Sequence, residues 1–248
     1  MSVLGKLALV TGAASGIGRA TCRILADEGA AIIAADCNLS GAKDTIGSLK
    51  SSHNNENLAL TMAVDESSSV KKGLKLILEQ YSKPPSIVVN CAGITRDNFL
   101  LKMSEQDFDD VIRVNLKGTF LVMQTFANAV IQYKINNASF INIASIVGKH
   151  GNIGQANYCA SKAGVELLTK TASKEFGKFG IRCNVILPGF TDTPMVKMVP
   201  EKVKQKLIPF ISAGRFGLPE EIAQTIAFLA SEKSSYVNGA SIEVTGGF

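Results

Sequence analysis

Short apolar runs alternate with amphipathic segments along the whole chain of 248 residues. The runs have the length of strands, and the segments between them have the length and periodicity of helices. Because strands joined through helical crossovers run parallel, this alternation predicts an α/β fold, a parallel sheet with helices on both faces. We expect strands at Leu7–Thr11, Ala31–Ala35, Ser86–Asn90, Phe140–Ala144, Arg182–Leu187 and Ser241–Val244, and helices near 16–28, 40–50, 67–80, 104–133, 157–178 and 219–230.

No stretch of the sequence marks a boundary between domains. The chain has only 7 prolines, and no Ser/Gly/Pro-rich linker interrupts the alternation of strands and helices. We therefore expect a single domain over residues 1–248, which is long enough to bury roughly three quarters of its unfolded surface. The most polar stretch, Ser51–Asn57, is expected to be a surface loop.

The composition argues against several classes of protein. A hydrophobic share of 46% and a charged share of 19% are typical of an ordinary globular protein. The net charge of +5 is spread along the chain and forms no basic stripe, so nucleic acid is not expected as a partner. No apolar run approaches the ~18–20 residues that a membrane span needs. The first expected strand begins too near Met1 to leave room for a cleavable targeting peptide.

Neither the cysteines nor the histidines have the spacing of a metal site. The five cysteines form no C-x-x-C pair, which indicates free thiols in a reducing compartment. His53 and His150 are distant from each other and from any cluster of carboxylates, so each is interpreted as a surface residue. We expect no metal and no His-based catalytic triad.

A glycine-rich segment, T-G-A-A-S-G-I-G at 11–18, follows the first expected strand and opens the first expected helix. Gly12, Gly16 and Gly18 allow a tight turn and let the backbone approach a pyrophosphate, whose charge the helix N-terminus favours. An acidic residue, Asp36, closes the second strand 24 residues after Gly12. This combination predicts a dinucleotide site on a doubly wound sheet of the Rossmann type, whereas a turn without a ligand would leave Asp36 unexplained.

Asp36 also bears on which dinucleotide binds. Its carboxylate can accept hydrogen bonds from a free adenosine ribose, but it repels a 2′-phosphate. No basic residue stands at positions 15, 37 or 38, so NAD(H) is favoured over NADP(H) as the cofactor. Lys43 and Arg19 are the cations that can still reach this place from elsewhere.

Tyr158 and Lys162, in the pentapeptide Y-C-A-S-K, are four residues apart and would share one face of a helix. Most such pairs are surface neighbours. An adjacent ammonium, however, favours the phenolate and lowers the pKa of a phenol from its usual ~10. The pair is therefore a hypothesis for a proton-transfer site, and other features of the chain have to support it.

From about residue 5 to its end, the chain resembles the short-chain dehydrogenase/reductase family. The resemblance rests on features in a fixed order: T-G-x-x-x-G-x-G at 11–18, N-C-A-G at 90–93, Asn115 in V-N-L-K-G, Ser145, Y-x-x-x-K at 158–162 and P-G at 188–189.

The resemblance implies a role for each of four catalytic residues, Asn115, Ser145, Tyr158 and Lys162. Reduction of a ketone by a nicotinamide needs a proton donor at the developing alkoxide, and Tyr158 would be that donor. Lys162 would hold the nicotinamide ribose, Ser145 would bind the substrate oxygen, and Asn115 would anchor a water beside the lysine. Ser145 and Tyr158 would thus also contact the substrate.

The resemblance further implies the contacts of the cofactor. The glycine loop would meet the diphosphate and the nearby ribose, Asp65 the adenine edge, and Asn90 to Gly93 the adenosine side. The implied cofactor residues are Gly12, Ser15, Gly16, Ile17, Gly18, Asp36, Asp65, Asn90, Ala92, Gly93, Tyr158, Lys162, Thr191 and Thr193, the two threonines meeting the nicotinamide amide and phosphates. Residues from about 191 to 215 would form an apolar lid that suits acyl chains and steroids equally.

Within the family, G-N-I-G-Q-A-N-Y at 151–158 resembles the ketoacyl reductases of fatty-acid synthesis. The stretches at 84–95, 115–122 and 145–155 resemble an animal mitochondrial branch, in which 3-ketoacyl-acyl-carrier-protein reductase and 17-beta-hydroxysteroid dehydrogenase activities occur. That likeness implies NAD(H), 3-ketoacyl and (3R)-3-hydroxyacyl thioesters of coenzyme A or acyl carrier protein, and steroids such as estradiol as a second substrate class. It also implies the mitochondrial matrix, with the cytoplasm as the alternative.

Oligomerisation is a further implication of the likeness. We expect a homotetramer, or a heterotetramer with a related reductase subunit, with the helices near 104–133 and 157–178 at the principal interface. The sequence leaves open which of these forms, which thioester is used, the acyl chain length and the direction of hydride transfer.

Three residues depart from the family pattern. Cys91 replaces the second asparagine of N-N-A-G, and Ala144 stands where a serine often precedes the catalytic one. Phe179 occupies the place of an arginine that docks the carrier protein in bacterial reductases, which favours coenzyme A thioesters or steroids. Two other functions stay open: an NADPH-dependent carrier-protein reductase, and a mainly structural nucleotide-binding subunit.

Overall fold

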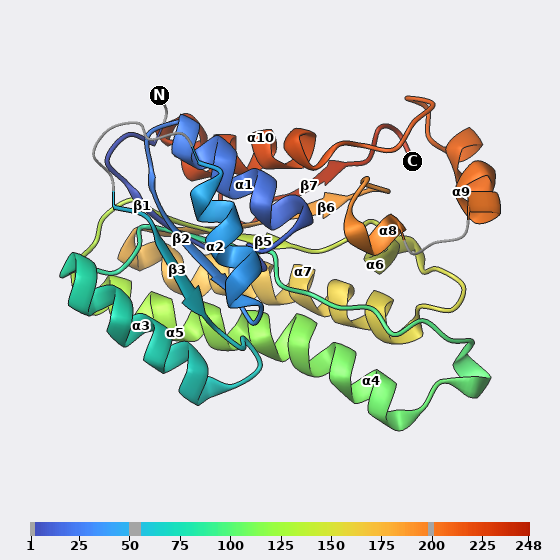
Figure 1. Ribbon diagram of the computed structural model, residues 1–248, viewed down its shortest axis with the longest axis horizontal. Coiled ribbons are helices and arrows are strands. Elements are labelled where there is room, and N and C mark those ends of the chain that lie inside the picture. The colour runs from blue at the N-terminus through green and yellow to red at the C-terminus, as the bar shows by residue number, and fades with distance from the viewer. Residues whose placement is uncertain (1–2, 50–55, 198–200) are drawn as a thin grey trace.

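The computed structural model describes residues 3–49, 56–197 and 201–248, and a parallel sheet runs through their centre (Figure 1). The order of its strands is β3-β2-β1-β4-β5-β6-β7. The strands are β1 (Leu7–Thr11), β2 (Ala31–Asp36), β3 (Leu58–Thr61), β4 (Ile87–Asn90), β5 (Ala138–Ile143), β6 (Ile181–Pro188) and β7 (Ser241–Val244).

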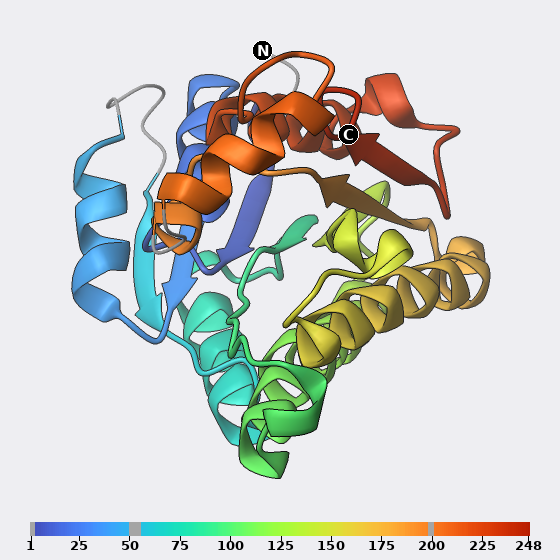
Figure 2. The same ribbon diagram turned by 90° about the vertical axis from the view of Figure 1, so that its right-hand side faces the viewer.

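Helices cover both faces of the sheet, as the view along it shows (Figure 2). One face carries α1 (Gly16–Asp27), α2 (Leu39–Gly47) and α10 (Pro219–Ala230). The other carries α3 (Ser67–Tyr81), α5 (Gly118–Gln132) and α7 (Ala156–Phe176). The short helices α4 (Glu105–Val111), α6 (Val147–His150), α8 (Pro194–Lys197) and α9 (Glu201–Leu207) lie in the connections. The prediction of a doubly wound parallel sheet is therefore confirmed.

The central strands β1, β4 and β5 are mainly apolar because both of their faces are buried. Successive side chains of a strand point to opposite faces. In β1, Val10 packs toward α1 and α10, in the same cluster as Leu25 and Ile226. Its neighbour Leu9 packs toward α3 and α5, with Ile77 and Phe126. The two cores account for the near-continuous apolar runs in the sequence.

The position of the site follows from the order of the strands. The chain runs outward from β1 through β2 to β3, and then returns so that β4 pairs with the other side of β1. The loops after β1 and β4 consequently leave the sheet in opposite directions and open a crevice at the carboxyl ends of these strands. In open α/β sheets, ligands bind at such a switch point.

Most element boundaries agree with the sequence, and two differences have physical reasons. The helix expected over 104–133 is divided into α4, a π-helical turn at Ile112–Lys117 and α5. The π turn is only six residues long and is continuous with the helices on both sides, so the apolar pattern of the sequence does not separate it from them. β3 was not among the expected strands; it is four residues long, and only Leu60 of them is buried.

Other expectations can be placed only in part. Most of the loop expected at Ser51–Asn57, with His53, lies outside the described residues, as do residues 198–200 of the expected lid. His150 is exposed, and all five cysteines are free thiols. Over the described ranges, no helix combines the length and hydropathy needed to cross a membrane, and no three His, Cys, Asp or Glu side chains gather as a metal site.

Candidate active site

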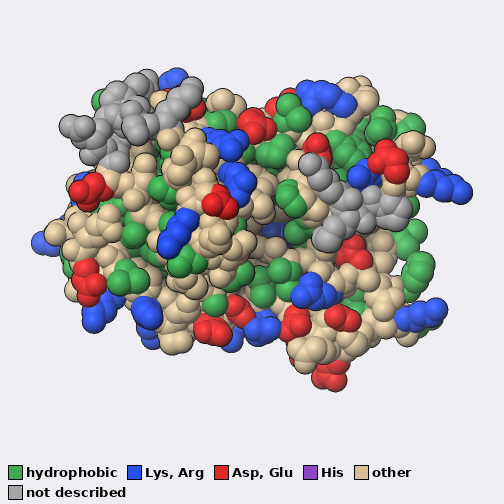
Figure 3. Space-filling model, viewed as in Figure 1, with side chains coloured by type: hydrophobic (Ala, Val, Ile, Leu, Met, Phe, Trp, Pro, Cys, Tyr) green, Lys and Arg blue, Asp and Glu red, His purple; other side chains and the backbone are tan. Residues whose placement is uncertain are grey.

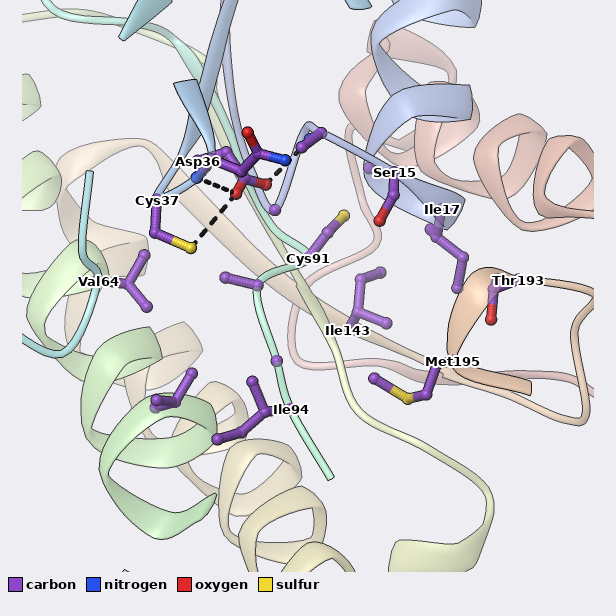
Figure 4. A pocket seen from close by; sticks show the side chains of 18 of the residues that line it. Ser15, Ile17, Asp36, Cys37, Val64, Cys91, Ile94, Ile143, Thr193 and Met195 are labelled. Atoms are coloured by element: carbon purple, nitrogen blue, oxygen red, sulfur yellow. Dashed lines mark hydrogen bonds between the residues drawn. The ribbon is translucent and has the colours of Figure 1, made fainter. Parts of the chain in front are cut away.

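A cavity of about 510 Å³ lies at the switch point, between the glycine loop, the ends of β2 and β5, the loop after β4, and the starts of α7 and α8 (Figure 4). Asp36 and Cys37 stand at one end of it, and Thr193 and Met195 at the other. The structure thus brings together, around one cavity, the predicted residues Gly12, Ser15, Gly16, Ile17, Gly18, Asp36, Asp65, Ala92, Gly93, Tyr158, Lys162 and Thr193.

The glycine loop has the shape that a pyrophosphate requires. Gly12 and Gly16 have φ angles of +66° and +52°, which side chains other than glycine rarely adopt. A Cβ on Gly18 would lie 2.2 Å from the carbonyl oxygen of Gly12, so the loop folds tightly upon itself. The first turn of α1 has no acidic residue, and Ser15 makes no capping bond with its side chain. The N–H groups of this turn are therefore available to an anion, and the residues present fit a dinucleotide.

The carboxylate of Asp36 is held in place by two backbone N–H groups. Ala14 donates to its Oδ2 and Asn38 to its Oδ1, each at 2.9 Å. Arg19, which we considered as a cation for this subsite, donates instead to the hydroxyl of Thr45 at 3.0 Å and to the Ala14 carbonyl. Lys43 is exposed and does not line the cavity. This end of the cavity therefore presents a fixed negative charge.

Two residues assigned to the cofactor by resemblance do not line the cavity. Asn90 is buried inside the sheet, where its Nδ2 donates to Asn142 at 2.8 Å, and its side chain lies on the face of α5 and α7. Thr191 is buried at the base of the expected lid and donates to the Gly189 carbonyl at 3.2 Å. Both assignments followed sequence position, which cannot tell which way a strand-end side chain points.

Asp65 lines the cavity, but its carboxylate is paired with the guanidinium of Arg113. Arg113 belongs to the π-helical turn and also binds Asp110 at 2.6 Å. The carboxylate expected at the adenine edge is thus shared with this ion-pair network.

Asn115 sits in the π-helical turn and is completely buried. Its Oδ1 accepts the N–H of Ile94 at 2.8 Å, and its Nδ2 donates to the Ile94 carbonyl at 3.0 Å and to the Ser161 hydroxyl at 3.1 Å. The wider π turn places this amide between the loop after β4 and α7. The structure shows Asn115 as the tie between these elements, and its role in anchoring a water stays a prediction.

Lys162 is buried without a carboxylate partner, and only 5% of it is exposed. Its Nζ donates to the Ile143 carbonyl at 2.8 Å and lies 5.6 Å from the centre of the Tyr158 ring. Burial lowers the pKa of Lys162 to about 8. The expected pair on one face of α7 is thus present, with the ammonium directed to the end of β5.

Tyr158 corrects one expectation about the site. Burial raises its pKa to about 12, a hydrogen bond with Ser145 acts in the opposite direction, and the charge of Asp97 raises it further. We expected Lys162 to lower this pKa, but removal of the phenol from water raises it, and Lys162 is not among the groups that shift it. The phenol of Tyr158 is therefore protonated at neutral pH, and its role as proton donor stays a prediction.

Several residues of the cavity escaped the sequence reasoning. Most are apolar, and the sequence offers no way to distinguish an apolar cavity wall from ordinary core. They are Ala14, Cys37, Asn38, Met62, Ala63, Val64, Ile94, Val114 and Ile143.

The tight glycine loop makes the substitution Gly18→Ala a direct test of the cofactor site. Its Cβ would clash with the Gly12 carbonyl, so we expect binding of NADH to weaken at least about tenfold. Gly47→Ala is the control, because a Cβ there meets no atom within 4 Å. Fluorescence titration with NADH measures both, and equal Kd values in the two variants would contradict the assignment.

The buried charge of Lys162 predicts that Lys162→Met makes the cofactor-free protein more stable at pH 7. The ammonium has a pKa of 10.5 when exposed and about 8 when buried, so the folded state holds its proton less tightly than the unfolded chain. The advantage of the variant, up to about 3 kcal/mol below pH 8, shrinks as the pH rises toward 10.5 and the wild-type amine becomes neutral.

Denaturation by urea at pH 7 and pH 9.5 measures this difference. Lys174→Met, at an exposed position on the same helix, is the control and should show no such dependence on pH. If Lys162→Met is less stable than the wild type at pH 7, and by the same free energy at pH 9.5, the buried ammonium does not destabilise the folded protein.

Comparisons with known proteins agree with this geometry. A family model described as enoyl-(acyl carrier protein) reductase matches residues 12–248. The chain is 52% identical to mouse (3R)-3-hydroxyacyl-CoA dehydrogenase over 97% of this chain and 95% of that protein. It is 44% identical to the 3-oxoacyl-[acyl-carrier-protein] reductase FabG of Thermotoga maritima, over 100% and 99% of the two chains.

A solved structure extends the similarity to the fold. The crystal structure of levodione reductase superposes with a TM-score of 0.93 at 30% identity and covers 98% of each chain. The glycine loop, the buried lysine and the protonated tyrosine thus occur in a chain that is similar to these three proteins over nearly its whole length. The chain belongs to the short-chain dehydrogenase/reductase family, whose members are oxidoreductases that use a nicotinamide cofactor.

Proposed function

We propose that the protein is an NAD(H)-dependent oxidoreductase that interconverts 3-ketoacyl and (3R)-3-hydroxyacyl thioesters. The observation that carries this proposal is that Tyr158, Lys162 and the glycine loop line one cavity, with the Lys162 ammonium 5.6 Å from the centre of the Tyr158 ring. The names of relatives at 52% and 44% identity supply the substrate class. Intact Tyr158, Lys162 and Ser145 argue against a purely structural subunit, which has no use for them.

The residues of the chain divide the work of the reaction between them. When bound, the nicotinamide supplies or accepts the hydride. Tyr158 gives its phenolic proton to the carbonyl oxygen that becomes an alkoxide, and in the reverse direction takes it back. Ser145 donates a hydrogen bond to the same oxygen, and the positive charge of Lys162 stabilises the phenolate that remains. The apolar wall around them excludes water, which strengthens each of these interactions.

The adenosine end supports NAD(H) over NADP(H). The carboxylate of Asp36 is fixed by Ala14 and Asn38, and it would repel a 2′-phosphate. Arg19 is engaged by Thr45 and the Ala14 carbonyl, which removes the nearest candidate for binding that phosphate.

The surface around Phe179 supports coenzyme A, rather than the acyl carrier protein, as the group that carries the acyl chain of the substrate. Phe179 is 42% exposed, and the Lys178 ammonium lies over its ring at 5.1 Å. A lone ammonium above an aromatic ring lacks the forked geometry with which arginine grips acidic groups. On the face drawn in Figure 3, positive and negative side chains are interspersed. Steroids such as estradiol are a second candidate class, supported by the apolar Met195 at the far end of the cavity.

We further propose that the protein forms a tetramer and acts in the mitochondrial matrix. Phe120 on α5 and Leu167 on α7 are 41% and 62% exposed, and apolar side chains of this size on neighbouring helices suit contact with another subunit. The same surface can pack against a second copy of this chain or against a related reductase subunit.

Substitution of the proton donor tests the proposed reaction. We expect the purified wild type to reduce acetoacetyl-CoA with NADH, and Tyr158→Phe to lower kcat by a factor of about 10²–10⁴, with little change in Kd for NADH. Tyr133→Phe, at an exposed tyrosine, is the control. An unchanged rate in Tyr158→Phe would remove the tyrosine from the mechanism, and a wild type without turnover would refute the proposed function.

Substitution of the acidic residue tests the choice of cofactor. We expect the wild type to bind NADH more tightly than NADPH, and Asp36→Asn to reduce that preference at least about tenfold, because the repulsion of the 2′-phosphate is lost. Asp44→Asn removes the same charge from an exposed position on α2 and should leave the preference intact. Side-by-side fluorescence titrations measure both Kd values, and tighter binding of NADPH by the wild type would overturn the assignment.

A further inference from the structure

The segment between β6 and α10 supplies one wall of the cavity. It brings Thr193 and Met195 to the end opposite Asp36 (Figure 4). A Cβ on Gly16 would lie 3.3 Å from the Cγ2 of Thr193, so this threonine stands directly over the glycine loop. The helices of the segment, α8 and α9, have four and seven residues, and helices of that length are not stable by themselves. The position of the segment therefore depends on contacts with the rest of the protein.

The two ends of the β6–α10 segment are bonded to each other. The N–H of Gly217 donates to the Phe190 carbonyl at 2.9 Å, and the N–H of Asp192 donates to the Gly217 carbonyl at 2.8 Å. Thr191 and Gly217 form a parallel bridge. The rings of Phe190 and Phe216 stack with their centroids 5.7 Å apart. The segment is thus a loop that is closed at its base, immediately before Thr193 of the cavity wall.

Phe248 packs on the first end of this loop from outside the segment. Its ring meets that of Phe190 edge to face, with the centroids 5.2 Å apart and the planes at 81°. Phe190 therefore contacts two rings, Phe216 from the second end of the segment and Phe248 from the residues that follow β7. Aromatic pairs in these geometries stabilise a structure beyond the apolar area that they bury.

The two glycines before Phe248 bind the second end of the segment. The N–H of Ala213 donates to the Gly246 carbonyl at 2.9 Å, and the hydroxyl of Ser212 donates to the Gly247 carbonyl at 2.9 Å. Gly247 has a φ of +83°, and a Cβ there would lie 2.7 Å from the Ser212 hydroxyl, so this close approach depends on glycine. The run that ends in Phe248 is thereby fastened to both ends of the segment.

We propose that Phe248 is a positioning residue, which holds the β6–α10 segment so that Thr193 and Met195 stay at the cavity. Phe248 lies outside the cavity wall and acts through Phe190. Without its ring, the segment occupies the binding-competent position for a smaller fraction of the time, and a ligand that needs this wall binds more weakly by that fraction. The inference rests on the proposed function, because it takes the nicotinamide half of NADH to occupy this end.

AMP and NADH distinguish the two ends of the cavity. AMP fills only the end at Asp36, whereas NADH also extends to Thr193 and Met195. We expect Phe248→Ala to raise Kd for NADH about two- to tenfold, the range of one lost ring contact, and to leave Kd for AMP unchanged. Fluorescence titration measures Kd for NADH, and displacement of NADH by AMP measures the second constant.

Phe228→Ala is the control, because its ring is 41% exposed on α10, near the Leu229 carbonyl that accepts from Ser139 at the amino end of β5, away from the cavity. Phe248→Leu keeps apolar volume without the ring, and it repeats the test if Phe248→Ala does not fold.

Three results would overturn the inference while the proposed function stands. They are an unchanged Kd for NADH in Phe248→Ala, an equal weakening of NADH and AMP in both Phe248 variants, and the same shift in Phe228→Ala. The second result would mean that Phe248 supports the fold as a whole and not this wall. A wild type that binds neither NADH nor AMP overturns the proposed function, and the inference with it.

Discussion

The side chain of Asn115 binds both backbone groups of Ile94 and the hydroxyl of Ser161, and the site is built around these bonds. They join the π-helical turn, the loop after β4 and α7, three elements that are far apart in the sequence. A completely buried amide is costly unless its donors and acceptor are satisfied, so its position is strongly determined. Ile94 lines the cavity and Ser161 precedes Lys162, and both are placed by the same amide.

The charge of the cavity changes along its length. Asp36 makes one end negative, and the N-terminus of α1 makes the middle favourable to anions. The ammonium of Lys162 adds a positive charge beside the Tyr158 ring. The carboxylate of Asp36 and this ammonium are each fixed by hydrogen bonds to the backbone.

The cavity contains a group that is unfavourable for folding. Lys162 is buried, and among the described residues its ammonium pairs with the Ile143 carbonyl and with no carboxylate. It lies beside the end of β5, where an apolar residue would pack more favourably. Such conflicts between stability and function concentrate at functional sites, because the chemistry needs groups that the core disfavours.

The sequence by itself determined the parallel sheet, the glycine loop and the pairing of Tyr158 with Lys162. Each depends on local periodicity or on spacing within one helix, which neighbours in the chain decide. Only the tertiary structure decided that Asn90 points into the core, that Asp65 is shared with Arg113, and that burial raises the pKa of Tyr158. The direction of a side chain, its burial and its charged neighbours depend on groups that are distant in the sequence. Only packing of the folded chain brings these groups together.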